Sequence, residues 1–174
     1  MTRSTDRARA SVRVDVDIDE AFRVFTEEID RWWRRGRQFR VAGQRRGFMA
    51  IEPGPDGRLF ESFETKHGDV KVIETGRVTV WEPPTRIAFE WRNENFRADE
   101  KTFVEVTFKP GARGTMVTVT HWGWDAVRPD HPARHGLAPA PFLGMLGRWW
   151  GDLLTALRRQ TRSDESSAGH TAAD

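Results

Sequence analysis

Six short segments between residues 47 and 124 alternate polar and apolar residues with a period of two, which is the pattern of half-buried β-strands. These segments are 47–52, 59–64, 70–81, 86–93, 102–109 and 115–124. Short turns rich in Gly and Pro, such as 54–57 and 110–114, join them, and connections this short join antiparallel neighbours. The sequence therefore predicts an antiparallel sheet with one apolar face that another element has to cover.

A predicted helix from Ala138 to Gln160 is long enough to provide that cover. Prolines occupy its first turn, where a missing N–H is tolerated, and apolar residues then recur at helical spacing from 143 to 157. Gly144, Gly147 and Gly151 form a second strip on this helix, at a cost of about 1 kcal/mol per glycine in helix propensity. Such a strip indicates either close packing against the helix backbone or space kept open beside it.

The N-terminal part contributes one more strand and a pair of helices. Alternating valines from Val12 to Val16 predict the strand, and the capping-box spacing of Asp17 and Glu20 predicts the first helix. The order of elements is then strand, two helices, six strands and helix. We expect an α+β fold in which a curved, seven-stranded antiparallel sheet wraps around the long C-terminal helix.

The domain is expected to span residues 10–161. Residues 1–9 and 162–174 are polar or small, and we expect both ends to be disordered. Nowhere do about 18 apolar residues run together, and the N-terminus lacks the apolar core of a signal peptide. We therefore expect a cytoplasmic protein that does not contact a membrane.

The charge balance gives little support to nucleic-acid binding. The isoelectric point is high, at about 9.5, but the formal net charge is only +2 and the chain contains neither Tyr nor Cys. Because no side chain then titrates between His and Lys, a small excess of positive charge moves the isoelectric point far upward. We expect no nucleic-acid partner, and the absence of Cys excludes disulfides and thiolate metal sites.

Basic charge is concentrated in the segment 31–46, which holds seven arginines and no acidic residue. One interpretation is a solvated connector whose arginine stems cover the faces of neighbouring tryptophans. The other is a contact site for an anion or a polyanion. The second interpretation includes an interaction protein that acts on a chaperone or another partner through this face.

Several motifs in the strand region occur together in one known family. They are Gly76-Arg77-Val78, the run from Trp81-Glu82-Pro83-Pro84 to Trp91, Thr102 to Phe108 followed by Gly114-Thr115, and His121. With Trp150, Leu154 and Leu157 in the final helix, this pattern resembles the activator of heat shock protein 90 ATPase homologue-like family. That family belongs to the START-like superfamily of helix-grip proteins, also described as SRPBCC or polyketide cyclase-like. The resemblance covers about residues 10–160 and is strongest over 76–123.

The resemblance implies a hydrophobic cavity between the sheet and the final helix, which relatives use to hold lipids, sterols, polyketides or other apolar molecules. It does not imply one reaction. Strand alternation and the glycine strip predict which residues form the cavity walls. The predicted ligand-binding residues are Trp33, Phe60, Val78, Phe89, Trp91, Val106, Val119, His121, Gly144, Gly147 and Trp150.

An enzymatic alternative uses His121 with Glu74. If both side chains point into one apolar pocket, burial and mutual proximity tune them as an acid and base of a cyclase or hydrolase. In the structural interpretation, Glu74 is a solvated residue at a strand end and His121 is a hydrogen-bonded interior histidine. No nucleophile elbow, phosphate-binding loop or dinucleotide fingerprint is present, and we expect no cofactor.

Two further features have residue types that occur in binding sites. His131 and His135 have the spacing of paired zinc ligands, but Pro129 and Pro132 argue against a regular helix there, and we expect no metal. Trp122 and Trp124 lie on the opposite strand phase from the predicted core. We expect these two tryptophans to cover the outer face of the sheet, where a paired ridge could support a homodimer.

Overall fold

The computed structural model describes residues 6–170, with side chains described as far as Ser163. Residues 1–5 and 171–174, which fall in the two ends expected to be disordered, lie outside the described residues. The order of elements agrees with the sequence prediction. The elements are β1 (Arg7–Val14), α1 (Ile18–Glu27), α2 (Ile29–Trp32), β2 (Gly47–Ile51), β3 (Arg58–Glu64), β4 (Val70–Glu82), β5 (Arg86–Trp91), β6 (Thr102–Gly111), β7 (Gly114–Trp122), two short 3-10 helices, η1 (Trp124–Ala126) and η2 (Pro132–Arg134), and α3 (Pro139–His170).

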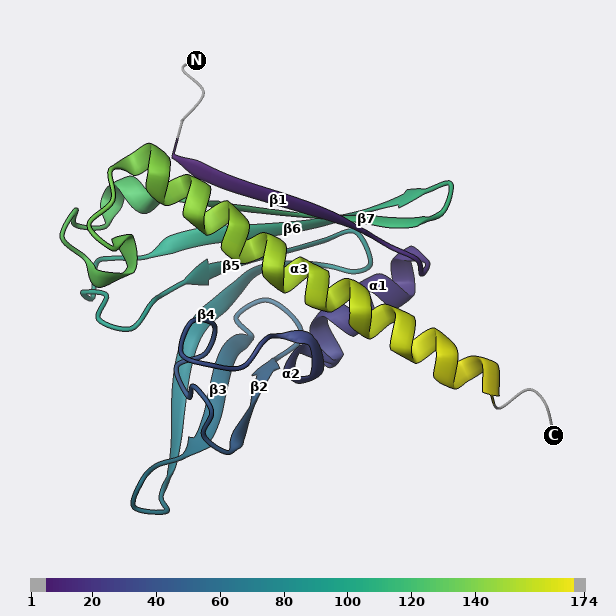
Figure 1. The fold of residues 1–174 in the computed structure, drawn as a ribbon, viewed down its shortest axis with the longest axis horizontal. Helices are drawn as coiled ribbons and strands as arrows, with labels where there is room; N and C mark the ends of the chain where they lie inside the picture. Colours follow the sequence, from purple (N-terminus) through teal and green to yellow (C-terminus); the bar gives the residue numbers. More distant parts are fainter. Residues whose placement is uncertain (1–5, 171–174) are drawn as a thin grey trace.

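The seven strands form one antiparallel sheet in the order β1-β7-β6-β5-β4-β3-β2. Consecutive strands from β2 to β7 are neighbours in the sheet. β1 then pairs with β7 and forms the far edge. Figure 1 shows the sheet curving around α3, so the predicted helix-grip architecture is confirmed.

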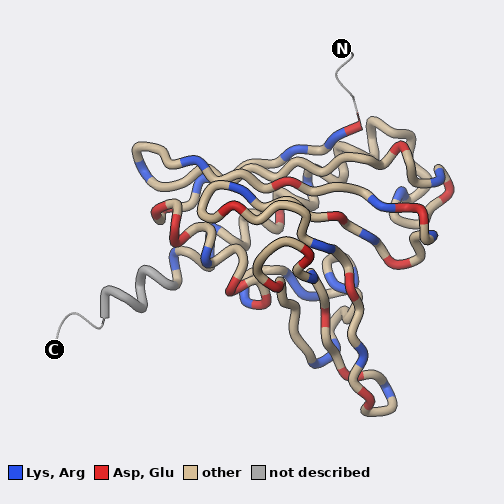
Figure 2. Tube along the Cα trace, turned by 180° about the vertical axis from the view of Figure 1, so that it is seen from behind, with Lys and Arg blue, Asp and Glu red and all other residues tan. Residues whose placement is uncertain are grey.

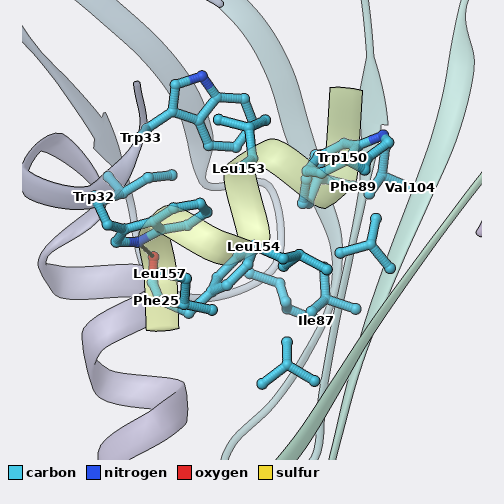
Figure 3. Close-up of a cluster of buried hydrophobic side chains, with 14 of the residues drawn as sticks. Phe25, Trp32, Trp33, Ile87, Phe89, Val104, Trp150, Leu153, Leu154 and Leu157 are labelled. Atoms are coloured by element: carbon cyan, nitrogen blue, oxygen red, sulfur yellow. Dashed lines mark hydrogen bonds between the residues drawn. The ribbon is translucent and has the colours of Figure 1, made fainter. Parts of the chain in front are cut away.

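The core lies between α3, the helical pair and the concave face of the sheet. Trp150, Leu153 and Leu157 of α3 have no exposed surface, and Phe25 of α1 is equally buried. Figure 3 shows these side chains meeting Ile87, Phe89 and Val104 of the sheet. Burying an apolar side chain of this size contributes about 1.5–3 kcal/mol. Packing along this face therefore fixes α3 against the sheet.

β1 begins at Arg7, so residues 7–9 belong to the sheet and not to the disordered N-terminus that the sequence predicted. Arg7 and Arg9 pair with Trp122 and Thr120 of β7. The strand phase there places only an alanine on the inner face, between two arginines. The apolar signal was therefore too weak to extend the predicted strand.

α3 continues to His170, ten residues beyond its predicted end at Gln160. Residues 162–170, expected to be part of a disordered tail, are therefore helical. Thr161 is fully buried, which shows that the packed part of the helix reaches past the last leucine of its apolar face. No helix in the described part of the chain is long and apolar enough to span a membrane.

The glycine strip of α3 borders open space. A Cβ built on Gly151 would meet nothing within 4 Å, and one on Gly144 would meet only the guanidinium of Arg148 at 3.6 Å. A Cβ on Gly147 would lie 3.7 Å from the carbonyl oxygen of Arg9 in β1, which is an ordinary contact. Close approach of another backbone is therefore not the reason for these glycines.

Replacing Gly144 or Gly151 by Ala is therefore expected to stabilise the protein. Each change should add about 0.5–1 kcal/mol to the free energy of unfolding, because alanine is the better helix former and the new methyl group meets no obstacle. Urea denaturation followed by circular dichroism measures the change. Gly47→Ala is the control, since its Cβ would lie 2.1 Å from the carbonyl oxygen of Ser62, and it should destabilise. Destabilisation by the α3 substitutions would contradict the expectation.

Candidate ligand-binding site

A large open cleft lies beside the N-terminal half of α3. Its volume is about 1940 Å³. One wall is α3, and the opposite wall is the segment 37–45 between α2 and β2, which we call the connector. The inner faces of β2 to β4 and the loops around 91–95 and 131–135 complete the cleft. The cleft lies toward the N-terminal end of α3.

Six Phe and Trp side chains line the cleft. Two of its rings come from α3, and the others come from the connector, the sheet and the loop after β7. The aromatic side chains that line the cleft are Phe39, Phe63, Trp91, Trp124, Phe142 and Trp149. Phe39, Phe63, Trp91, Trp124 and Phe142 are at most 9% exposed, whereas Trp149 is partly exposed. Trp149 therefore offers an apolar ligand the main exposed aromatic surface of this lining.

Trp149 joins the connector to α3. Its indole Nε1–H donates a hydrogen bond to the carbonyl oxygen of Gln38 at 2.8 Å. Its ring also stacks on Phe39, with centroids 5.8 Å apart and planes inclined by 23°. On its other side the ring makes an edge contact with Trp91, at 6.2 Å. Trp149 therefore links the connector on one side of the cleft to Trp91 of the sheet.

Two buried charged side chains anchor the connector from within. The Arg40 guanidinium, with the residue 4% exposed, donates to Asp30 Oδ1 at 2.6 Å and to the carbonyl oxygen of Trp33. The Glu61 carboxylate, with the residue 3% exposed, accepts the backbone N–H groups of residues 41 and 42 at 2.9 and 3.1 Å. Charge-assisted hydrogen bonds of this kind are about twice as strong as neutral ones. The connector is therefore a fixed wall of the cleft.

The anchoring role of Glu61 predicts the protease sensitivity of the connector. In Glu61→Gln the charged acceptor is lost, so local opening should increase and trypsin should cleave after Arg37 and Arg45 at least about threefold faster. Timed digestion with mass spectrometry of the fragments measures these rates. Glu105→Gln is the control, because that carboxylate pairs with Arg86 away from the connector. Unchanged cleavage in Glu61→Gln would show that other contacts hold the connector.

His121 lies at the inner end of the cleft, and both of its ring nitrogens are hydrogen-bonded. Nδ1 accepts the indole N–H of Trp150 at 3.1 Å, and Nε2 lies 2.7 Å from Thr102 Oγ1. Because an indole N–H can only donate, Nδ1 carries no proton and Nε2–H donates to Thr102. The Thr102 hydroxyl in turn donates to the carbonyl oxygen of Trp91 at 3.4 Å. The imidazole thus links α3 to three strands.

Burial lowers the pKa of His121 from 6.5 to about 3, so the ring is neutral in the folded protein. Its lone pair is already used by Trp150 and its proton by Thr102. A general base needs a free lone pair directed at the substrate, which this arrangement does not provide. The geometry therefore matches the structural interpretation, in which His121 is an interior histidine held by hydrogen bonds.

The depressed pKa of His121 predicts a loss of stability in mild acid. Below pH 6.5 the unfolded chain protonates this histidine, whereas the folded protein does so only near pH 3. The free energy of unfolding should therefore fall by up to about 1.4 kcal/mol per pH unit as the pH drops through this window.

Replacing His121 by Gln keeps an acceptor and a donor but removes the titration, so its stability should fall less steeply between pH 6.5 and pH 4. Urea titrations at a series of pH values give both slopes. His67→Gln, which changes an exposed histidine, should keep the wild-type slope. Equal slopes for His121→Gln and the wild type would contradict the assignment.

Glu74 does not point into the cleft. Thr75 is an extra residue in β4, because Leu59 pairs with Gly76 whereas Phe60 pairs with Glu74. This bulge reverses the strand phase, so Thr75 turns inward and Glu74 turns to the outer face. There the Glu74 carboxylate forms an ion pair with the Arg77 guanidinium, with 2.7 Å between oxygen and nitrogen. The structure therefore does not bring Glu74 and His121 together as an acid and base.

Of the predicted ligand-binding residues, Trp91 and His121 line the cleft. Most of the others form the packed core against α3 and the sheet, where rings fill the space that the sequence assigned to a cavity. These core residues are Trp33, Val78, Phe89, Val106, Val119 and Trp150. Gly144 and Gly147 lie on α3 outside the residues that line the cleft.

Phe60 lies on the outer face of β3, where its ring contacts that of the half-exposed Phe48, with ring centroids 6.1 Å apart. The inward side chains of this strand are Leu59, Glu61 and Phe63, all buried. The sequence analysis placed Phe60 on the cavity wall, whereas the structure turns Phe60 outward and Glu61 inward. The hydrogen bonds from the connector are what allow this carboxylate to face inward.

Trp124 is also inside the protein and not beside Trp122 on the outer face. Gly123 takes a positive φ of 95° and ends the strand alternation, and the Trp124 ring then packs against Phe142 at 4.8 Å. Trp122 stacks on Phe103 on the outer face, as expected, but the paired tryptophan ridge proposed for a homodimer does not form.

His131 and His135, which have the spacing of zinc ligands, lie in different environments. His131 is 2% exposed and its Nδ1 accepts the backbone N–H of Ala133 at 3.0 Å, whereas His135 is exposed at the end of η2. Burial and then the Arg128 guanidinium lower the pKa of His131. Among the described residues no three His, Asp or Glu side chains are grouped to hold a metal ion.

A seven-stranded antiparallel sheet curled around one long C-terminal helix, with a cleft beside that helix, defines a helix-grip domain of the START-like class. The family model for Activator of Hsp90 ATPase homolog 1-like protein matches residues 15–139. The chain therefore belongs to this family, as its motifs indicated. No curated protein shows significant similarity to it.

Solved structures share the fold at low sequence identity. Protein NE0264 from Nitrosomonas europaea is 14% identical, with a TM-score of 0.62 over 94% of this chain and 99% of that chain. Protein SA2116 from Staphylococcus aureus is 9% identical, with a TM-score of 0.65 over 92% and 95% of the two chains. DynU16, a protein from the dynemicin biosynthetic locus, is 21% identical, with a TM-score of 0.56 over 91% of this chain and 48% of that chain. Similarity at this level concerns the fold alone.

Proposed function

We propose that this domain binds one small, mainly apolar molecule in the cleft beside α3. The observation that carries the proposal is the aromatic lining of an open cleft of about 1940 Å³. Trp149 is only partly buried there, although its neighbour Trp150 is fully buried. Exposed aromatic area of this kind is unfavourable in water, and an apolar ligand would cover it.

The rigidity of the walls supports the same function. Buried polar anchors hold the connector, and Trp149 ties it to α3 through a hydrogen bond and a ring stack. A preformed site loses less conformational entropy on binding than a mobile one. A lipid, a polyketide or another apolar metabolite would suit this surface. The origin of the structural neighbour DynU16 in a biosynthetic locus supports a metabolite as one candidate.

The other two hypotheses lack a specific observation in their favour. The acid and base of the enzymatic hypothesis, His121 and Glu74, do not meet. For the chaperone-associated hypothesis, the arginines of the segment 31–46 would have to form an outward contact face. Four of the seven arginines form ion pairs within the chain, and two of the others line the cleft.

The neutral fluorophore 1-pyrenebutanol is a suitable probe, because energy transfer from the tryptophans that line the cleft reports its binding. In Trp149→Ala the cleft loses a central ring, and the dissociation constant should rise at least about tenfold, which corresponds to 1.4 kcal/mol. Fluorescence titration measures the constant, and circular dichroism checks that the variant is folded.

Trp122→Ala is a closely matched control. Trp122 is also partly buried and stacks on Phe103 at 5.8 Å, the distance found between Trp149 and Phe39, but on the outer face of the sheet. Its loss should change the dissociation constant by less than about twofold. The proposal fails if the wild type does not bind the probe, or if both substitutions weaken binding equally.

A further inference from the structure

The wall of the cleft carries an excess of positive charge. Six basic side chains line it, against three acidic ones. Elsewhere basic and acidic positions are interspersed along the chain, as the blue and red segments of Figure 2 show. The basic residues of the cleft are Arg37, Arg40, Arg45, Lys71, Arg92 and Arg148.

Among residues 6–163, Arg40 is the one of these six cations that forms an ion pair with a carboxylate, that of Asp30. In the described part of the chain, ion pairs join Arg34 and Arg35 of the segment 31–46 to acidic residues. Arg37 and Arg45, in contrast, have none, and both are exposed to the cleft. The Arg45 guanidinium lies over the ring of Phe63, at 5.7 Å from its centroid. The two arginines therefore present charge directly beside the aromatic lining.

Three acidic side chains, Glu61, Glu94 and Asp152, offset part of this charge and leave the basic side chains in excess. Glu61 is buried and its carboxylate is occupied by two backbone N–H groups. Asp152 lies 3.9 Å from the guanidinium of Arg34. A concave surface with low-dielectric walls concentrates the remaining positive potential within it. An anion is therefore favoured in this cleft over a neutral molecule of the same shape.

We infer that the cleft selects an organic anion of the carboxylic acid class, whose apolar body covers the aromatic lining and whose carboxylate faces Arg37 and Arg45. This inference rests on the proposed function and adds the charge of the ligand to it. Guanidinium groups suit this role because their planar array of donors matches the two oxygens of a carboxylate.

The matched probes 1-pyrenebutyrate and 1-pyrenebutanol test the inference, since they differ in the carboxylate and share the ring system. At low salt the acid should bind about tenfold more tightly than the alcohol, and added salt should reduce the difference. In the double variant Arg37→Gln, Arg45→Gln the ratio of the two affinities should fall below about threefold. Tryptophan-to-pyrene energy transfer gives all four dissociation constants.

The double variant Arg113→Gln, Arg159→Gln is the control. It removes the same charge from exposed arginines that do not line the cleft, and it should keep the wild-type preference. Equal affinity of the wild type for the two probes would overturn the inference and leave the proposed function standing. A preference that survives the loss of Arg37 and Arg45, or that the control loses equally, would also overturn it. If neither probe binds, the proposed function itself fails.

Discussion

The burial of Trp150 against the concave face of the sheet is the contact on which the other parts of the structure depend. Its ring has no exposed surface, and its N–H is held by the buried His121, so the residue is both packed and hydrogen-bonded. An apolar ring with one satisfied polar atom can fix orientation as well as position. α3 is thereby held in one rotation about its axis. That rotation presents the adjacent Trp149 to the cleft, so packing of the core determines the lining of the site.

The same packing explains why the fold could be predicted and the cavity walls could not. Period-two strands, short turns and one long amphipathic helix have few compatible arrangements, and the helix-grip fold is one of them. Whether a residue such as Phe89 or Val119 lines a cavity or fills a core depends on the volumes of all its neighbours. Alternation gives only the face on which a side chain lies. The buried tryptophans Trp32, Trp33, Trp91, Trp124 and Trp150 fill space that smaller side chains would leave open.

Three local errors have specific physical causes. The phase of Glu74 changed at a one-residue bulge, and that of Trp124 changed at a glycine with positive φ. Glu61 faces inward because a segment 20 residues away supplies its hydrogen-bond donors. The connector that forms one wall has no periodic pattern, and the lone Phe39 between arginines was the available signal for its role. Bulges and long-range polar contacts leave little trace in periodicity, so this part of the site required the structure.

The start of the chain has a structural role that its composition conceals. The carboxylate of Asp6 accepts the backbone N–H groups of Gly123, Trp124 and Asp125, at 3.0–3.2 Å. These three bonds fix the turn that directs the Trp124 ring inward. A truncated protein that begins at residue 10, where the sequence alone would place the domain boundary, would lack this tether. Expression designs that remove or replace Asp6 would therefore alter a wall of the cleft more than a hundred residues away.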